Sequence, residues 1–558
     1  MSTARTSDLW WKNAVVYCLD VETFLDRDGD GHGDFEGLTD RVDYLAGMGV
    51  SCLWLMPFHP SPNRDDGYDI VDYYGVDDRL GSLGDFVAFV RTAKDRGLRV
   101  IIDLVVNHTS DKHPWFRAAR ASRTSPYRDF YVWADEPPAE PKPDIVFPDA
   151  EDSIWTYDDR AGQWYLHHFY SHQPDVNIAN PRVRDEIGKI AGFWLQLGVD
   201  GFRVDAVPFL VETGGISTGD VTLDPHEVLR DLRGFVSRRA GDAVMLGEVN
   251  LPARGLRRFF GGASGDELQM LFDFPVMQNM YLSLARQDAR PLAKALAARP
   301  AIPDDSQWAT FVRNHDELTL DQLSEKQRQE VFDAFGPEPH MQLFGRGLRR
   351  RLPPMVGGDQ ARIRLVYSLL FSLPGTPVLF YGEEIGMGEN LDVDGRSSVR
   401  TPMQWTSEEN GGFSKARPSR LVRPVVDGEF GPLAVNVADQ RRADDSLLNW
   451  MERIIRRRRE TPEIGWGRCT VLDPGDNAVL AHRCDWERSA VVAVHNLSAA
   501  PRNVTVPLGD VEGVDRLVDL IDGAQPVRTL DGPSIDLDLP GYGFRWFRLH
   551  EAGSRTTP

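Results

Sequence analysis

The stretch RVIIDLVVNH, residues 99–108, decides the fold class. Its apolar run is typical of a strand that is buried on both faces, and it ends in the polar residues Asn107 and His108. An amphipathic helical pattern, residues 83–96, comes directly before it. A helix followed by a buried strand with polar residues at its end indicates a parallel α/β unit whose carboxyl end carries a site.

The same unit recurs along the chain. Further helical sequence, such as residues 182–197, alternates with the apolar runs. Eight such units predict an α/β fold of the (β/α)8 TIM-barrel type, and a doubly wound open sheet is the alternative. The expected strands are residues 14–19, 51–56, 99–105, 200–204, 243–246, 268–272, 308–312 and 377–380.

Two connections are too long for plain loops. Residues 109–180, after the third strand, are rich in Pro, Trp, Tyr and Asp, and we expect them to form an inserted subdomain. Residues 317–360, after the seventh strand, include the helical, charged stretch 324–335 and lie where a lid over the barrel mouth would be.

Beyond Arg459 the pattern changes to short strands separated by turns, which predicts a C-terminal all-β sandwich. The expected strands there are residues 478–482, 490–496, 502–506 and 543–549. We therefore expect a catalytic barrel over residues 1–108 and 181–460, an inserted subdomain over 109–180 and a sandwich over 461–558.

The composition is that of an ordinary globular protein. The chain has 558 residues, of which 41% are hydrophobic and 26% charged, so disordered, collagen-like and fibrous proteins are excluded. Its formal net charge of −21 argues against a nucleic-acid partner. The basic run 456–459 has a polyanion patch as one interpretation, but in so acidic a chain we read it as a solvated helix face.

Several features predict a cytoplasmic protein without a membrane partner. Four scattered cysteines are too few for a disulfide framework or a zinc site, which favours a reducing compartment. Residues 1–20 lack a secretory signal, and the most apolar stretch, 365–381, is broken by Pro374-Gly375. The sequence leaves the oligomeric state open, a homo-oligomer included.

Carboxylates stand at the ends of three different expected strands, as Asp205, Glu248 and Asp316. Convergence on one pocket would make them repel one another and raise at least one pKa. One protonated acid beside one ionised carboxylate is what glycoside hydrolysis requires. Singly, each residue has a structural cap or an ion pair as its alternative interpretation.

These strand ends resemble the signature regions of glycoside hydrolase family 13, the α-amylase family. The motifs occur in order between about Trp11 and Trp405. Residues 173–177, Gln-Pro-Asp-Val-Asn, resemble the fifth region in its oligo-1,6-glucosidase form. The remaining matches are residues 103–108, 201–205, the Glu248 segment, 314–316, and 375–377 with 381–384.

The resemblance implies a retaining double displacement. Asp205 would be the nucleophile that forms a covalent β-glucosyl intermediate, and Glu248 the acid/base. Asp316 would hold sugar hydroxyls as the transition state forms. Arg203 would keep the carboxylate of Asp205 ionised and aimed.

The resemblance also implies a closed glucose pocket, which favours a small α-glucoside such as a disaccharide. His108 and His315 would bond hydroxyls of the bound glucose. Tyr68 would stack on its apolar face, Asp65 would accept hydroxyl hydrogens, and Arg400 would face the same sugar.

A separate stretch, residues 26–34, reads DRDGDGHGD and places carboxylates at alternate positions of a Gly-rich turn, which suits a hard cation. The twelfth position is Gly37 rather than a bidentate Glu, so this is not an EF-hand. The same motif in related glucosidases holds Ca²⁺, and we expect a structural calcium ion here, with an unoccupied turn as the alternative. The expected ligand residues are Asp26, Asp28, Asp30, His32 through its carbonyl, and Asp34. No organic cofactor is expected.

Within the family the sequence is most similar to the trehalose synthase branch, which isomerises maltose and trehalose by intramolecular glucosyl transfer. The matching segments are residues 54–58, 107–111, 128–133, 313–320 and 345–356, and residues 20–24 match only loosely, whereas residues 17–20, 210–217 and 247–250 depart from the branch. Isomerase-like transfer is the first expectation, and exo-acting α-glucosidase or transglucosidase activity is the alternative. A non-catalytic scaffold is disfavoured because all three carboxylates are present, and an endo-acting amylase because of the Asp65 and Tyr68 pocket.

Overall fold

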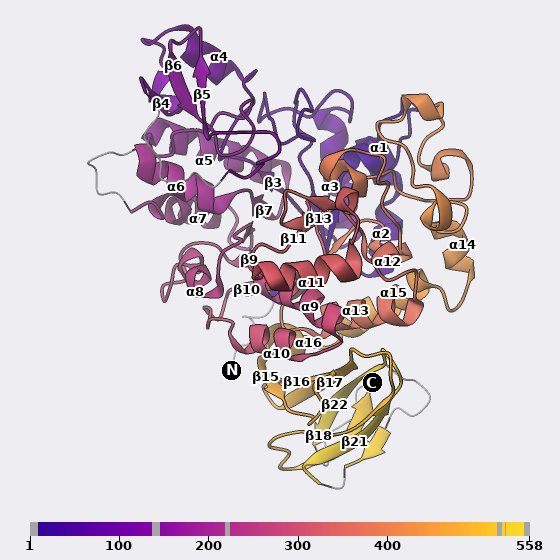
Figure 1. Cartoon of the computed structure of the whole chain (residues 1–558). Coiled ribbons are helices and arrows are strands. Elements are labelled where there is room, and N and C mark those ends of the chain that lie inside the picture. The colour runs from indigo at the N-terminus through magenta and orange to yellow at the C-terminus, as the bar shows by residue number, and fades with distance from the viewer. Residues whose placement is uncertain (1–8, 137–144, 218–223, 522–526, 531, 552–558) are drawn as a thin grey trace.

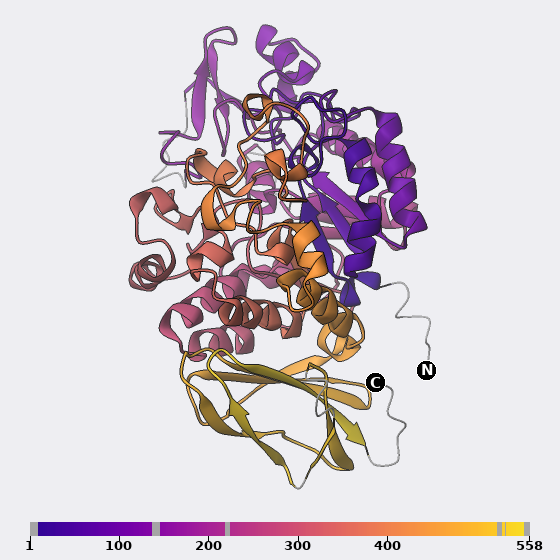
Figure 2. The ribbon, with the colours of Figure 1, turned by 90° about the vertical axis from the view of Figure 1, so that its right-hand side faces the viewer.

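The structure is a computed structural model that describes residues 9–136, 145–217, 224–521, 527–530 and 532–551. A central barrel carries a small inserted subdomain at one end and two antiparallel sheets at the other (Figure 1). The view from the side shows the same order along the long axis of the molecule (Figure 2). No helix among the described residues is long and apolar enough to cross a membrane.

Eight parallel strands close into the barrel, so the predicted TIM barrel is confirmed and the open-sheet alternative is wrong. The first strand pairs with both the second and the last, because Val16 lies opposite Cys52 and Val378. Around the barrel the order is β1-β14-β10-β9-β8-β7-β3-β2. The strands are β1 Val16–Leu19, β2 Cys52–Leu55, β3 Arg99–Leu104, β7 Gly201–Val204, β8 Val244–Gly247, β9 Met270–Phe272, β10 Gln307–Phe311 and β14 Thr376–Phe380.

Gly201 allows two neighbouring strands of the barrel wall to approach each other closely. It pairs with Val244 of β8, and its φ of 147° lies in the region that favours glycine. A Cβ at this position would lie 2.1 Å from the Val244 carbonyl oxygen. Only glycine therefore lets β7 and β8 approach closely just below Asp205.

Helices surround the barrel, and their ends follow local capping rules. Ser82 and Asp85 form a capping box at the start of α3, and α5 begins after the N-cap Asn180 and ends at Gly198. The helices are α1 Phe35–Asp40, α2 Val42–Met48, α3 Leu83–Asp95, α5 Pro181–Leu197, α6 Val207–Ser217, α7 Glu227–Arg239, α8 Ala253–Leu256, α9 Phe274–Arg286, α10 Arg290–Ala297, α13 Gln360–Ser372, α14 Val437–Arg442 and α15 Leu447–Arg459. Short 3₁₀ helices include η1 Trp10–Asn13, η2 Val21–Thr23, η4 Arg257–Phe260, η6 Glu383–Ile385 and η7 Gly395–Val399.

The inserted subdomain follows β3, as the predicted fold class requires. It packs around an aromatic centre in which Phe116 stacks on Trp133 at 5.6 Å and meets Tyr131 and Tyr165 edge-on. It comprises α4 Pro114–Ala121, η3 Arg128–Phe130 and the sheet of β4 Trp133–Ala134, β6 Gln163–Leu166 and β5 Trp155–Asp158. The precise domain bounds proposed from the sequence stay predictions.

The segment after β10 packs its helix on the barrel and sends a turn toward the subdomain. The rings of Tyr281 in α9 and Phe335 in α11 lie 5.8 Å apart, and those of Phe147 and Phe344 lie 5.1 Å apart. This second contact joins the segment to the subdomain above the barrel. The elements are β11 Leu318–Thr319, α11 Glu325–Phe335, η5 Pro339–Met341, β12 Gln342–Leu343, β13 Gly347–Leu348 and α12 Leu352–Met355.

The C-terminal strands form the predicted sandwich, because a six-stranded and a two-stranded sheet share one apolar core. The sandwich docks on α13, where Trp546 Nε1 donates to Ser368 Oγ at 3.0 Å and His482 Nε2 to the Ser372 carbonyl at 2.8 Å. After α16 Pro462–Trp466 the strands are β15 Arg468–Leu472, β16 Val479–Trp486, β17 Ser489–Asn496, β18 Arg502–Pro507, β19 Val514–Asp519, β20 Val527–Thr529, β21 Ser534–Leu539 and β22 Phe544–Glu551.

Candidate active site

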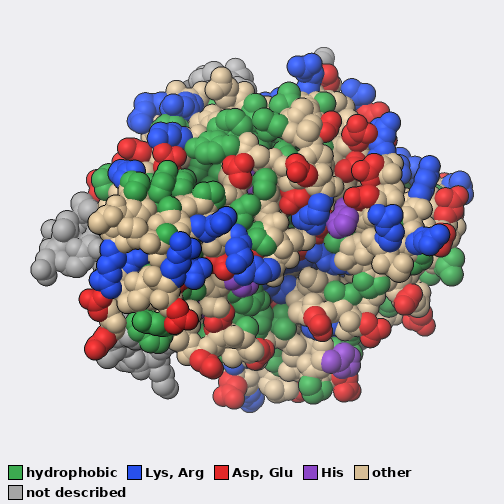
Figure 3. Space-filling model, turned by 90° about the horizontal axis from the view of Figure 1, so that it is seen from above, with side chains coloured by type: hydrophobic (Ala, Val, Ile, Leu, Met, Phe, Trp, Pro, Cys, Tyr) green, Lys and Arg blue, Asp and Glu red, His purple; other side chains and the backbone are tan. Residues whose placement is uncertain are grey.

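The three predicted catalytic carboxylates line one cavity of about 750 Å³ at the barrel mouth. Asp205 directly follows β7, Glu248 directly follows β8, and Asp316 lies in the turn after β10. The cavity is also lined by three predicted sugar-binding residues, Asp65, Tyr68 and His108. On the face seen from above, acidic and basic side chains are interspersed (Figure 3).

Arg203, buried in β7, connects three carboxylates beneath the cavity floor. Its Nη1 donates to Asp205 and, at 2.6 Å, to Asp103, and its Nη2 donates to Glu248 at 2.6 Å. Trp54 Nε1 donates to the second oxygen of Asp103 at 2.7 Å. One guanidinium that reaches both Asp205 and Glu248 favours the close carboxylate spacing of retaining glycosidases.

The Asp205 and Glu248 carboxyls are both buried, and each affects the pKa of the other. Burial raises the pKa of each to about 7, although the charge of Arg203 opposes the shift. Because the two groups interact, the pair takes up protons in two steps and holds one proton near neutral pH. Both pKa values are raised, as the sequence predicted for at least one carboxyl, and one carboxylate beside one carboxylic acid is the combination that glycoside hydrolysis requires.

Asp316 has the opposite environment. Burial alone would raise its pKa, but the positive charges of Arg396 and Arg400 outweigh burial and lower it. Burial also lowers the pKa of His315, so this ring is neutral at pH 7 and the two arginines keep Asp316 ionised. Arg396 Nη1 and Arg400 Nη2 donate to Asp316 Oδ1 at 2.7 Å and 2.9 Å.

The predicted glucose-binding residues form one hydrogen-bonded group. Tyr68 stacks on His315, with ring centroids 5.5 Å apart and planes at 7°, and its hydroxyl lies 2.7 Å from His315 Nε2. His108 Nε2 lies 3.2 Å from the Tyr68 carbonyl, and burial lowers the pKa of His108. Both histidines are therefore neutral donors or acceptors rather than charges.

Arg396 is a site residue that the sequence reasoning missed. Its guanidinium bridges Asp316 and Asp65, and Gln173 Nε2 donates to the other Asp65 oxygen at 2.9 Å. Its position four residues before Arg400 in one segment was the available signal. Arg400 itself is 1% exposed and does not line the cavity; its Nη1 pairs instead with Asp66 at 2.6 Å.

The far wall of the cavity contains the segments that depart from the branch. Phe209 and Glu212 of α6 line it, as does Asn250, whose Nδ2 donates to Asp321 at 2.8 Å and 3.0 Å. Phe169 of the subdomain packs edge-on against Phe209 at 5.2 Å. This part of the lining thus combines the aromatic ring of Phe209 with the polar side chains of Glu212 and Asn250. Residues 218–220 of the altered loop lie outside the described residues.

The predicted metal residues lie away from the cavity, between β1 and α1. Carboxylate oxygens of Asp26, Asp28 and Asp34 lie within 4.8 Å of one another. Asp34 also caps α1 through the Gly37 amide. Asp30 instead accepts the His32 amide at 2.8 Å, so the structure brings together the carboxylates of three of the four predicted aspartates.

The family follows from a match over most of the chain. The catalytic domain of α-amylase matches residues 20–334 and 349–467, and a sucrose hydrolase-like C-terminal domain matches residues 489–548. The chain belongs to the α-amylase family. The expected family resemblance is confirmed, and the chain is a glycoside hydrolase-family enzyme.

Several full-length members of the α-amylase family are similar to this chain. The trehalose synthase of Pimelobacter sp. is 41% identical, over 98% of this chain and 97% of its own length. The trehalose synthase/amylase TreS of Mycolicibacterium smegmatis is 40% identical, over 98% and 94%. Glucan 1,6-alpha-glucosidase of Streptococcus pneumoniae is 31% identical, over 90% and 94%. The chain is therefore a trehalose synthase-like member of the α-amylase family.

Solved structures of the family superpose on the whole chain. An inactive double mutant of MutB in complex with isomaltulose has a TM-score of 0.77 at 27% identity, covering 97% of this chain and 99% of its own. The α-amylase from H. orenii has a TM-score of 0.77 at 27% identity, covering 97% and 100%. A protein solved with isomaltulose and an α-amylase thus share this architecture with the chain.

Proposed function

We propose that the protein interconverts maltose and trehalose by transferring a glucosyl group within one closed site. The observation that carries the proposal is the cavity itself. On one side the Asp205–Glu248 pair and the arginine-anchored Asp316 face a glucose unit, and on the other side a wall with Phe209 and Asn250 faces a second sugar. A volume of about 750 Å³ is within the range of small-molecule sites.

The first half of the reaction cleaves the disaccharide. Glu248 donates its proton to the glycosidic oxygen while Asp205 attacks the anomeric carbon, which forms a covalent β-glucosyl ester and releases glucose. Asp316 remains ionised beside its arginines and accepts hydroxyl hydrogens of the distorting sugar, so it stabilises the transition state.

The second half decides between transfer and hydrolysis. Glu248, now a carboxylate, removes the proton from the acceptor hydroxyl, which attacks the ester carbon and frees Asp205. Two inversions retain the α configuration. If the released glucose stays in the cavity, turns and attacks through its anomeric hydroxyl, maltose becomes trehalose; attack by water gives glucose.

Hydrolysis of small α-glucosides is the second candidate function. The similarity to glucan 1,6-alpha-glucosidase favours it, because that enzyme is 31% identical to this chain over 90% of the chain's length. The catalytic carboxylates do not distinguish the two outcomes, since both use the same glucosyl ester.

Product analysis separates the two functions. The enzyme is incubated separately with maltose, trehalose, sucrose and isomaltose, and products are identified by NMR. Trehalose from maltose and maltose from trehalose, with little free glucose, is the expected result. Free monosaccharides as the sole products from every substrate would exclude isomerisation and leave the α-glucosidase.

For the loop of residues 26–34 we propose a structural calcium ion. The carboxylates of Asp26, Asp28 and Asp34 converge and offer the hard oxygen ligands that Ca²⁺ prefers, and the ion would pin the start of α1 to the end of β1. Chelation with EDTA should lower the melting temperature, and calcium should restore it. An Asp28→Asn variant should lose this calcium response, and an unchanged melting curve under chelation would contradict the site.

The proposed compartment is the cytoplasm. The support is indirect: all four cysteines are free, and three of them are buried. Cell fractionation with an antibody against the full chain tests the proposal.

A further inference from the structure

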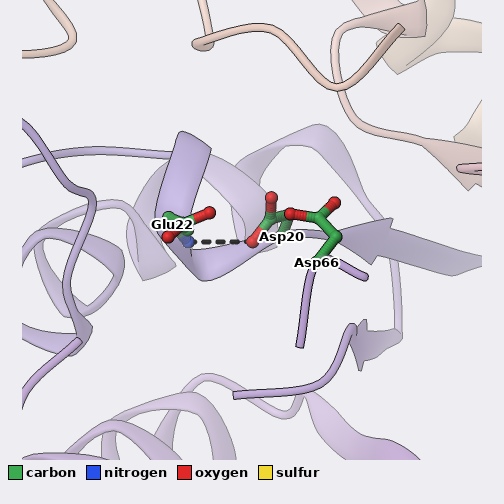
Figure 4. Close-up of side chains that lie close together, drawn as sticks. All are labelled: Asp20, Glu22 and Asp66. Atoms are coloured by element: carbon green, nitrogen blue, oxygen red, sulfur yellow. Dashed lines mark hydrogen bonds between the residues drawn. The ribbon is translucent and has the colours of Figure 1, made fainter. Parts of the chain in front are cut away.

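Three acidic side chains converge behind the glucose-binding group. Asp20 directly follows β1, Glu22 lies in η2, and Asp66 lies in the turn after β2 (Figure 4). Oxygens of the three carboxylates lie within 4.8 Å of one another, and Asp20 and Glu22 are 5% and 4% exposed. Buried carboxylates this close require a cation or protons between them.

The cation of this cluster is Arg423. Its Nη1 lies 3.4 Å from Asp20, its Nη2 lies 3.4 Å from Glu22, and the same Nη2 donates to Asp66. Glu22 has a second cationic partner in Arg79, whereas Asp20 has Arg423 as its one ion-pair partner among the described residues. The guanidinium already occupies the place that a metal ion would take, so the cluster is an arginine site.

Arg423 also holds Arg400, at two points. Its Nη1 donates to the Arg400 carbonyl at 3.1 Å. Asp66 accepts Arg423 at Oδ1 and Arg400 Nη1 at Oδ2, the latter at 2.6 Å. The backbone of Asp66 is left-handed, with φ of 52°, a conformation that few residues other than glycine adopt. In this conformation the Asp66 carboxylate contacts both arginines.

Arg400 in turn contacts two residues of the candidate active site. Its Nη2 donates to Asp316 at 2.9 Å and its Nε to the His315 carbonyl at 2.7 Å. A continuous chain of hydrogen-bonded charges therefore runs from Arg423 through Asp66 and Arg400 to Asp316.

We propose that Arg423 is a positioning residue for the reaction, which acts through Asp66 and Arg400 to fix the Asp316 carboxylate. Asp20 and Glu22 hold Arg423 from behind. This positioning role depends on the proposed function only for the role of Asp316.

The test is an Arg423→Ala variant assayed by hydrolysis of an aryl α-glucoside, which reports glucosyl-ester chemistry whether or not the enzyme isomerises disaccharides. Asp316 acts in the transition state, so kcat should fall by about 10- to 100-fold while KM changes by less than about threefold. Guanidinium ion at tens of millimolar should restore part of kcat. Arg423→Lys should be intermediate, because one ammonium cannot bind Asp66 and the Arg400 carbonyl in the same geometry.

A double-mutant cycle with Asp66→Asn tests the route. If Arg423 acts through Asp66, the double variant should lose no more kcat than the more damaged single variant. A loss equal to the product of the two single losses would overturn this route.

Arg458 is the matched control, because it is also buried and its side chain's hydrogen-bond partners among the described residues are Asn13 and the Gly375 carbonyl, at the opposite end of the barrel. Arg458→Ala should lower the melting temperature without changing kcat or responding to guanidinium. A folded Arg423→Ala variant with wild-type kcat would overturn the proposal, as would equal guanidinium rescue of the control. If Arg423→Ala does not fold, wild-type kcat in Arg423→Lys below its melting temperature would overturn it.

Discussion

Arg203 donates hydrogen bonds to Asp103, Asp205 and Glu248, and this one side chain sets the charge of the catalytic floor. Burial raises the pKa of Asp103 to about 6, and Arg203 and Trp54 oppose that shift. Asp103, Asp205 and Glu248 are thus held by a single guanidinium that stays protonated.

Asp205→Asn should abolish turnover while the fold survives. The amide cannot form the glucosyl ester, so kcat should fall by at least ~1,000-fold. Arg203 keeps Asp103 and Glu248 as partners, so the melting temperature should stay within a few degrees. Aryl α-glucoside hydrolysis and circular dichroism measure the two effects. Asp231→Asn, at an exposed ion pair with Arg184, is the control, and residual activity near that of the control would remove Asp205 as nucleophile.

The pKa values of Asp205 and Glu248, both raised to about 7, predict a bell-shaped pH dependence of kcat/KM. Catalysis needs the pair with one proton. As pH falls, the nucleophile gains a proton, and as pH rises, Glu248 loses its proton, so both limbs should decline from a maximum near neutrality. Melting curves across the same range separate loss of folding from titration. A rate that is constant between about pH 5 and 9 would contradict this electrostatic picture.

The sequence predicted that Asp205, Glu248 and Asp316 would lie in one cavity, because each follows a strand and the carboxyl ends of parallel strands meet at one face. It could not predict Arg423. That residue lies in the long irregular stretch after β14, and its partner Asp20 is 403 positions away, so no local pattern links them. Arg396 and Asp66 escaped prediction for the same reason: each pairs across more than 300 residues.

At the scale of elements, the inserted subdomain meets the segment after β10 through aromatic rings. Phe147 stacks on Tyr170 at 4.3 Å, meets Phe344 at 5.1 Å, and lies under the Arg396 guanidinium at 4.8 Å. These contacts enclose the cavity and support the lid that the sequence predicted over residues 317–360. Enclosure matters because water competes with the retained glucose for the glucosyl ester.

Phe344→Ala should therefore raise hydrolysis relative to transfer. Loss of the ring opens the contact with Phe147, so water reaches the ester more often, and the fraction of free glucose among the products should rise severalfold. NMR of a maltose reaction measures the ratio. Tyr157→Ala, an exposed aromatic residue of the same subdomain, should leave the ratio unchanged, and equal ratios in both variants would count against the lid.

At the scale of the whole molecule, a pair of buried histidines docks the C-terminal sandwich on the barrel. The rings of His482 and His495 stack at 6.2 Å, and their Nε2 atoms face Ser372 and Ser368 of α13. Burial lowers the pKa of His482 to about 4 and also lowers that of His495. Both rings are neutral in the folded protein at neutral pH.

Acid should weaken this docking. For His482 the folded pKa of about 4 is below the unfolded value of 6.5, so its contribution is complete above pH 6.5 and is lost as pH falls toward 4. The loss amounts to about 3 kcal/mol. His482→Gln keeps a donor for the Ser372 carbonyl and should reduce the fall in melting temperature between pH 7 and 5, whereas exposed His340→Gln should not. Identical pH dependence in the wild type and His482→Gln would contradict this.

The eight barrel strands and four of the sandwich strands were predictable, because buried strands carry continuous apolar runs. Strands β15, β19, β20 and β21 were missed, since β15, β19 and β20 are mostly exposed or half-buried and β21 alternates exposed and buried residues instead of carrying an apolar run. The docking of the sandwich on α13 could not be predicted from the sequence either, because it depends on the proximity of His482 and His495 to two serines in the folded protein.

Barrel closure has a consequence for how the protein is made. Val16 pairs with Val378, so one edge of the first barrel strand cannot pair until a residue 362 positions further along the chain has been synthesised. At ribosomal rates of about 5 to 20 residues per second, the nascent chain spends roughly 20 to 70 s with the edge of β1 unsatisfied. We therefore expect synthesis, rather than refolding of the finished chain, to be the stage at which chaperones protect this enzyme from edge-to-edge aggregation.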